Sequence, residues 1–238
     1  MGEEVFTIAS VKKFTDHAVP NQLRHIARAV VHPSNVDIDA SRSSLNRRLA
    51  PDRGMSPYDY YKTRKSELYC YNRKDVKTMA GWVVTVPADL PDTEHDRFFD
   101  AVYAFLSGRY GESNVVDAIV HKDEAGSPHL HFCFIPVVPD NKHGGEKICA
   151  NDLLNPKELQ RFHPLLQKHL DSLGIGAGVC TGVTAARGGN ITVDELKNKR
   201  NRDWEQNRNR NWNHERNSEY TDSRWYTNDN TIIYYKET

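Results

Sequence analysis

The amino-acid sequence predicts an α/β (α+β) sandwich, in which helices pack on the faces of a mostly antiparallel central sheet. Two strand-like segments, residues 115–121 and 129–137, are joined by a link too short for a parallel crossover, so they should pair antiparallel. Helical periodicity is clearest at residues 93–110 and 156–173. The chain has 238 residues, which is enough to bury a core in one or two domains.

The N-terminal third alternates between strand and helix signals. Residues 6–14 alternate in polarity and indicate a first strand, and apolar residues recur at helical spacing over 21–31. A polar, turn-rich stretch covers residues 32–53, and Ser56–Pro57 has the pattern of a helix start. Residues 79–87 are short and β-branched, which predicts a buried strand.

The later helices have the clearest boundaries. An apolar stripe at 3.6-residue spacing runs through 93–110, and Gly111 follows its end. The helix at 156–173 begins with proline, Asn155 fits its N-cap, and Gly174 fits its C-terminal stop.

Composition divides the chain in two. Residues 1–186 carry the periodic patterns and are expected to form one folded domain. Residues 187–238 include 10 Asn and little apolar periodicity, so we interpret them as an appended extension. Trp204 and Trp212, interleaved with arginine there, suit either stacking on single-stranded bases or docking of the extension.

Several classes of protein are disfavoured. No apolar run is long enough for a transmembrane helix, and the N-terminus does not resemble a signal peptide. The four cysteines are far apart and form no C-x-x-C pair, which disfavours a cysteine zinc site or a disulfide scaffold. These features predict a cytoplasmic protein without membrane insertion.

The formal net charge of zero conceals two opposed blocks. Residues 10–74 hold 13 basic against 6 acidic side chains, a net of +7, whereas residues 75–160 hold 7 against 14, a net of −7. The total alone disfavours a nucleic-acid partner, but a basic block can bind a polyanion and an acidic block can bind a cation. Ordinary surface charge explains the same pattern equally well.

Three histidines form the most specific pattern. His129 and His131 are two residues apart, so on a strand they share one face, while Leu130 and the phenylalanines that follow it face a core. His121 ends the preceding strand, and antiparallel pairing would bring it beside them. Three imidazoles with open positions suit a divalent ion such as Mn²⁺, Zn²⁺, Ni²⁺ or Co²⁺ better than an all-oxygen Mg²⁺ site. The sequence leaves three roles open for the turn residues Asp123 and Glu124: further metal ligands, groups that orient the imidazoles, or turn residues only.

Three ordered motifs across residues 20–175 resemble the Mob/Pre plasmid mobilisation relaxases, the MOBV class of HUH endonucleases. The histidine motif H-x-D-E-x-x-P-H-x-H-F-x-x-x-P is one. The first motif of the family resembles residues 24–46, and residues 73–85 resemble the second. The first-motif positions that match are His25, Arg28, Ser34, Asn35, Asp37, Ile38, Leu45 and Asn46.

The resemblance implies a metal-dependent enzyme that nicks one DNA strand at an origin of transfer and keeps the 5′-phosphate end covalently bound. It implies that His25 is the nucleophile and that His121, His129 and His131 hold the metal. The expected ion is Mn²⁺, with Mg²⁺, Zn²⁺, Ni²⁺ or Co²⁺ as alternatives. Glu124 is expected to assist His25. The expected partners are single-stranded or supercoiled plasmid DNA and a coupling protein of a conjugation system. The expected DNA contacts are Arg28, on the helix face of His25, with Ser34, Asn35, Asn46, Arg73 and Lys74.

The sequence departs from the family pattern in three places. The turn between His121 and His129 is one residue longer than usual, Arg47 replaces a tyrosine after Leu45–Asn46, and a long C-terminal region is missing. Two alternative functions therefore stay open. One is an HUH replication initiator or transposase with a nucleophile among the tyrosines of residues 58–71, and the other is a DNA-binding relative without cleavage.

Overall fold

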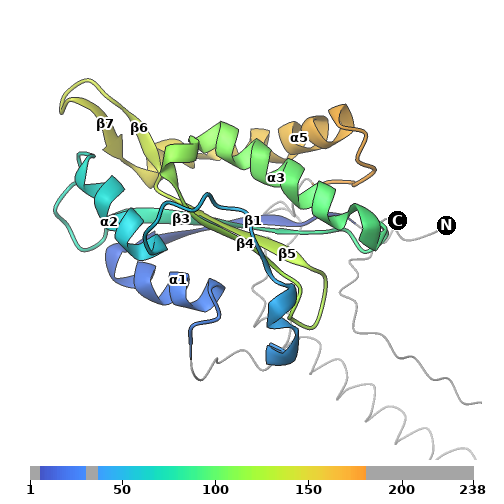
Figure 1. The fold of residues 1–238 in the computed structure, drawn as a ribbon. Coiled ribbons are helices and arrows are strands. Elements are labelled where there is room, and N and C mark those ends of the chain that lie inside the picture. The colour runs from blue at the N-terminus through green and yellow to red at the C-terminus, as the bar shows by residue number, and fades with distance from the viewer. Residues whose placement is uncertain (1–5, 31–36, 181–238) are drawn as a thin grey trace, which may run out of the picture. The chain divides into compact units, whose positions relative to one another are not determined.

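A five-stranded sheet forms the centre of the computed structural model, which describes residues 6–30 and 37–180 (Figure 1). The strand order is β1-β3-β5-β4-β2, and every neighbouring pair is antiparallel. The strands are β1 (Ala9–Thr15), β2 (Arg47–Arg48), β3 (Lys77–Thr85), β4 (Val115–His121) and β5 (His129–Phe134). The predicted fold class is confirmed, and the histidine strand β5 is the central one.

Helices cover both faces of the sheet (Figure 1). On one face, α3 (His95–Tyr110) and α5 (Pro156–Ser172) share a buried cluster with the sheet. On the other, α1 (Val19–Ile26) and α2 (Pro57–Ser66) share a second cluster with it. A hairpin of β6 (Val137–Asp140) and β7 (Gly145–Ile148) leads to the short α4 (Ala150–Leu153). Among the described residues, no helix is long and apolar enough to cross a membrane.

Alternation along β5 separates these two clusters. Leu130, Phe132 and Phe134 are fully buried on the α3/α5 side, whereas Cys133 belongs to the cluster under α1 and α2. His129 and His131 share the face of Cys133, because side chains two apart on a strand point the same way. The cluster under α3 and α5 therefore packs against one face of β5, and the histidines lie on the other face, on the side of α1.

The expected helix over residues 21–31 is wrong at its end. Helix α1 begins at Val19, because Pro20 suits the first turn, and stops at Ile26. Arg28 then adopts a left-handed conformation, with φ of 56°. The expectation that Arg28 lies on the helix face of His25 is therefore also wrong, since the chain turns before Arg28 is reached. The expected strand over 129–137 is also interrupted, because β5 ends at Phe134 before Pro136.

Candidate metal centre and active site

Three histidines meet at one end of the central strands. His121 and His129 are direct cross-strand partners, and His131 pairs with Ile119 one step along the same face. One ring nitrogen from each histidine lies within 4.8 Å of the others, which is close enough for a shared cation. The H-x-H spacing and the antiparallel pairing thus bring together the residues that the sequence grouped.

Backbone carbonyls orient two of the rings. The Nε2 atom of His121 lies 2.8 Å from the carbonyl oxygen of Ile26, at the end of α1, which requires a proton on that nitrogen. Nδ1 of His121 is buried and has no hydrogen-bond partner among the described residues. His129 similarly places Nδ1 3.3 Å from the carbonyl oxygen of Ser127. In both rings the second nitrogen keeps its lone pair, as a metal ligand must.

Burial keeps the imidazoles of His129 and His131 neutral. Burial lowers the pKa of His131 well below its usual value, and the neighbouring His129 and His121 lower it further. Burial also lowers the pKa of His129, although the negative charge of Glu124 opposes this. Neutral imidazoles at physiological pH can bind a cation without first losing a proton.

Glu124 supplies a carboxylate beside the three rings. Its Oε1 atom lies 2.6 Å from Nη2 of Arg28 and 3.7 Å from Nδ1 of His121, and its Oε2 atom lies 4.0 Å from Nε2 of His129. Burial works to raise the pKa of Glu124, but the adjacent His121, His129 and Arg28 outweigh it and lower that pKa. The carboxylate is therefore ionised at neutral pH.

His25 joins this group from α1. Its ring lies 6.2 Å from the ring of His131, centroid to centroid, at an interplanar angle of 86°. Burial lowers its pKa, and the positive charge of Arg28 adds to this effect, while Glu124 opposes it. His25 is accordingly a neutral, half-buried imidazole next to the candidate metal ligands.

A buried ion pair holds the turn that carries Glu124. Arg28 donates two hydrogen bonds to Asp123, from Nε at 2.9 Å and from Nη2 at 2.6 Å, and Asp123 is fully buried. Ser43 and Asn46 donate to the same carboxylate at 2.7 and 2.8 Å. Asp123 thus fixes the turn through hydrogen bonds from other protein groups. The sequence alone leaves this role of Asp123 open. Ser43 was missed altogether, because nothing local to it signals a partner 80 residues away.

The expected DNA contacts fall into different places. The side-chain oxygen of Asn46 accepts the backbone N–H of Lys122 at 2.8 Å, so both ends of its amide contact the protein. Arg73 and Lys74 are exposed and precede β3, at the end of the sheet opposite His129, since Thr85 is the β3 residue that pairs with His129. Ser34 and Asn35 lie outside the described residues.

Two tyrosines of residues 58–71, Tyr60 and Tyr61, are held by hydrogen bonds away from the histidine cluster. Tyr61 is buried and its hydroxyl lies 2.6 Å from Asp16 and from Thr78. Burial raises its pKa far above the usual value. The hydroxyl of Tyr60 donates to the carbonyl oxygen of Ser113 at 2.7 Å. These contacts are those of packing residues rather than of nucleophiles.

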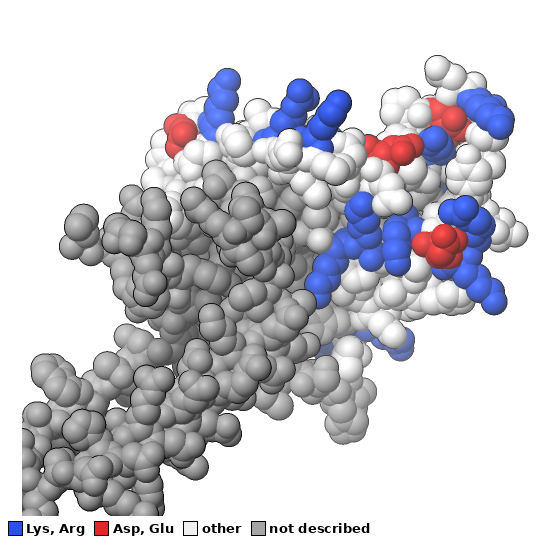
Figure 2. All heavy atoms as spheres, turned by 180° about the vertical axis from the view of Figure 1, so that it is seen from behind, with Lys and Arg blue, Asp and Glu red and all other residues white. Residues whose placement is uncertain are grey.

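Basic side chains predominate on part of the surface. Figure 2 shows the face opposite to that of Figure 1, and on its described part lysine and arginine outnumber aspartate and glutamate. A polyanion can approach such a face favourably.

Comparisons with known proteins agree with one another. A family model described as plasmid recombination enzyme (Mob_Pre) matches residues 4–178. A plasmid recombination enzyme of Lactiplantibacillus plantarum is 28% identical over 206 residues, which are 82% of this chain and 54% of the relative. One from Bacillus thuringiensis is 31% identical over 159 residues, which are 65% of this chain and 34% of the relative. The chain thus spans about half or less of the length of these relatives.

Solved structures give the same result. The MobM relaxase domain (MOBV; Mob_Pre), in a Mn-bound crystal structure with plasmid pMV158 oriT DNA, matches with a TM-score of 0.68 and 27% identity. That match covers 82% of this chain and 98% of the MobM domain. A second Mn-bound structure of the domain with oriT DNA matches with a TM-score of 0.67.

Proposed function

The chain belongs to the Mob_Pre family of plasmid recombination enzymes, and from this premise we propose that it is a DNA relaxase. It nicks one strand at an origin of transfer, forms a covalent protein–5′-phosphate intermediate and transfers or reseals the strand. The observation that carries the proposal is the neutral His25 ring, 6.2 Å from His131 of the histidine cluster. The MobM domain, which is similar to this chain, binds oriT DNA and Mn.

The residues of the cluster fit a divalent cation. Nδ1 of His121 is buried, keeps its lone pair and has no hydrogen-bond partner among the described residues, which would be costly without a ligand. Two further imidazoles and an ionised carboxylate surround it. We assign His121, His129 and His131 as the metal ligands, with Mn²⁺ as the preferred ion and Mg²⁺, Zn²⁺, Ni²⁺ or Co²⁺ as alternatives. A bound cation would neutralise negative charge on the scissile phosphate.

His25 is the proposed nucleophile. One nitrogen of a neutral imidazole has a free lone pair, so it can attack phosphorus without losing a proton first. The new bond joins this nitrogen to phosphorus, the bond from phosphorus to the 3′-oxygen breaks, and the 3′-oxygen takes a proton from solvent and leaves as a hydroxyl group. The product is a phosphoramidate at His25. Attack by a 3′-hydroxyl on this adduct reverses the step and reseals the strand.

Glu124 and Arg28 support the nucleophile. Glu124 is ionised and its charge raises the pKa of His25, so we assign it to accept the ring N–H of His25 as positive charge develops there. Arg28 contacts Glu124 at 2.6 Å and fixes the carboxylate. Arg28 is expected to contact a phosphate, but its partners in the structure are Asp123 and Glu124, so in this proposal it is a positioning residue.

The remaining expectations extend the proposal to partners. The substrate is plasmid DNA, single-stranded or supercoiled at its origin of transfer, and the reaction takes place in the cytoplasm. Arg73 and Lys74 would contact phosphates distant from the cleavage position, and Ser34 and Asn35 would contact the strand nearer to it. A coupling protein of a conjugation system would receive the covalent complex. The division into residues 1–186 and 187–238 is part of the same proposal.

The test is to identify the residue that carries the DNA. The protein is incubated with Mn²⁺ and labelled single strands that tile the DNA flanking the encoding gene, and the covalent peptide is mapped by mass spectrometry. We expect an acid-labile adduct on His25, lost in His25→Ala and retained in His17→Ala, a matched control at an exposed histidine. An adduct on tyrosine, or undiminished cleavage by His25→Ala, would favour the replication-initiator alternative. Absence of both cleavage and Mn²⁺ binding would favour the non-catalytic one.

A further inference from the structure

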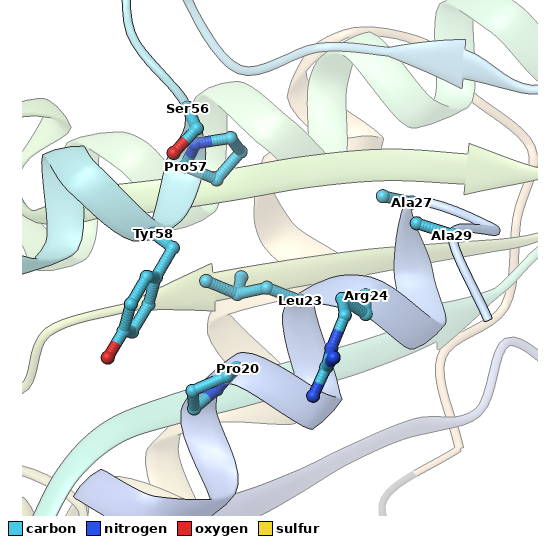
Figure 3. A pocket seen from close by; sticks show the side chains of 8 residues that line it. All are labelled: Pro20, Leu23, Arg24, Ala27, Ala29, Ser56, Pro57 and Tyr58. Carbon is cyan, nitrogen blue, oxygen red and sulfur yellow. The ribbon is translucent and has the colours of Figure 1, made fainter.

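A pocket of about 460 Å³ lies between α1 and α2 (Figure 3). This volume is within the range of about 300–1,000 Å³ that is usual for small-ligand sites. Leu23 and Arg24 of α1, the helix that carries His25, line the pocket, together with Ala27, which follows the helix. From α2 and the residue before it come Ser56, Pro57 and Tyr58.

The walls of the pocket are apolar and include one aromatic ring. In Figure 3 the Tyr58 ring extends from α2 towards the Pro20 end of α1, and Leu23 points from α1 towards α2. Tyr58 is 38% exposed, so part of its ring is accessible to solvent. It also stacks on Tyr61, with centroids 6.2 Å apart and an interplanar angle of 18°. Because the buried Tyr61 is itself held by hydrogen bonds, the exposed ring is a fixed platform.

Polar groups around the pocket favour an anionic occupant with an apolar face. Arg24 is the charged residue of the lining, and its guanidinium bonds to the neutral amide oxygen of Asn21 at 2.6 Å, so its charge is not cancelled. Lys62 lies over the Tyr58 ring, 5.0 Å from its centre, but Asp59 pairs with it at 2.8 Å, so the uncancelled charge at the pocket is that of Arg24. The hydroxyl of Ser56 is engaged with Asp59 through both of its hydrogen bonds. The lining therefore offers stacking and positive charge, and few groups that could read the edge of a base.

We infer that this pocket takes one unpaired base of single-stranded DNA, stacked on Tyr58, with the adjoining phosphate near Arg24. This inference rests on the proposed function, because the bound base would neighbour the phosphodiester that His25 attacks. Stacking on an aromatic ring accepts every base, because each has a π-face. The pocket thus adds affinity for an unpaired strand and little preference for sequence.

The experiment uses fluorescence anisotropy with two labelled strands of about 12 nucleotides, oligothymidylate and the same backbone with abasic residues. The full chain is titrated in the presence of Mn²⁺. We expect Tyr58→Ala to raise the Kd for oligothymidylate by about fivefold or more and to leave the Kd for the abasic strand unchanged. Tyr58→Phe keeps the ring and is the matched control, which should bind like the wild type.

A second variant approaches the pocket from the other side. Ala27 is exposed, so Ala27→Leu should fold while filling the space, and it should weaken oligothymidylate binding in the same base-dependent way. Thermal melts followed by circular dichroism check the fold of each variant. Equal losses on both strands, no loss in Tyr58→Ala, or no binding of oligothymidylate by the wild type would overturn the inference and leave the pocket to another occupant, such as a peptide segment. Base-dependent binding through Tyr58 without any covalent adduct would retain the inference and refute the proposed nicking.

Discussion

Asp123→Asn tests how much of the stability depends on the buried ion pair beside the candidate active site. The Asp123 side chain is fully buried and accepts four hydrogen bonds, two from Arg28, one from Ser43 and one from Asn46. The substitution keeps the shape of the side chain, but it removes the charge and turns an amide N–H₂ towards these donors. Arg28, whose side chain is 13% exposed, then loses a bidentate partner.

The expected cost is about 3 kcal/mol of unfolding free energy. Removing one partner of a buried ion pair costs about 3–5 kcal/mol, since the other charge stays buried without compensation. The lower end applies here, because Arg28 keeps its contact with Glu124 at 2.6 Å. With a urea dependence of about 2 kcal/mol per molar, the midpoint of unfolding should fall by about 1.5 M.

Urea unfolding is followed by circular dichroism in EDTA, so that metal binding does not contribute. Asp39→Asn is the matched control, because Asp39 is exposed and asparagine can still accept the hydrogen bonds of Ser41; its midpoint should stay close to that of the wild type. Arg28→Met combined with Asp123→Asn should cost less than the sum of the two single variants. A midpoint shift below about 0.3 M, or strict additivity, would refute the reasoning.

Three further predictions follow from single groups. Mn²⁺ at about 100 times its Kd should stabilise the wild type by about 2.7 kcal/mol, and calorimetry should show no such gain in His129→Ala. Burial raises the pKa of Asp117 despite its contact with Arg48 at 2.9 Å, so the folded state binds this proton more tightly and loses stability as pH rises above about 4. The melting temperature of Asp117→Asn minus that of the wild type should therefore be larger at pH 7 than at pH 4. An equal difference at both pH values would contradict this. Tyr61→Phe should lose about 1–2 kcal/mol of unfolding free energy in urea, because Thr78 loses a buried partner. The folded variant should still nick DNA, and loss of nicking would count against His25 as the nucleophile.

Local patterns predicted the elements that hold the histidines. The spacing of His129 and His131 fixes their common face on any strand, and the short link to His121 leaves antiparallel pairing as the only geometry. The helices α3 and α5 were predicted for a similar reason, since each has a continuous apolar stripe and a glycine after its end. Each of these signals is contained within about 20 residues of chain.

The rest depended on contacts between distant residues. Helix α1 ends just before Arg28, which turns towards Asp123, 95 residues away. No sequence pattern near Arg28 predicts this contact. The two-residue strand β2 pairs with β4 inside a stretch that looked like turns only. Asn46 matched a family motif, but whether its amide faces DNA or Asp123 is decided by tertiary structure. Sequence patterns thus predicted which residues gather and not how they are held.

The two opposed charge blocks illustrate this distinction. Several arginines of the basic block bind carboxylates of the acidic block, and the distances lie between 2.6 and 3.0 Å. They are Arg28 with Asp123 and Glu124, Arg47 with Asp100, Arg48 with Asp117, and Arg64 with Glu146. The blocks therefore largely neutralise each other on folding, and the net +7 overstates the charge available to DNA.

The salt dependence of DNA binding should reveal this neutralisation. The exposed cations that we assign to phosphates are Arg24, Lys74 and Arg73, whose ion pair with Asp75 at 3.2 Å is itself exposed to solvent. About three such contacts give a slope of log K against log salt concentration near −2 on a single strand. All 13 cations of the block acting together would give a slope about four times as steep. Anisotropy titrations of oligothymidylate from about 50 to 200 mM salt measure the slope. A value steeper than about −4 would mean that paired arginines release their carboxylates to bind DNA, and the ion pairs would then be exchangeable contacts rather than fixed parts of the fold.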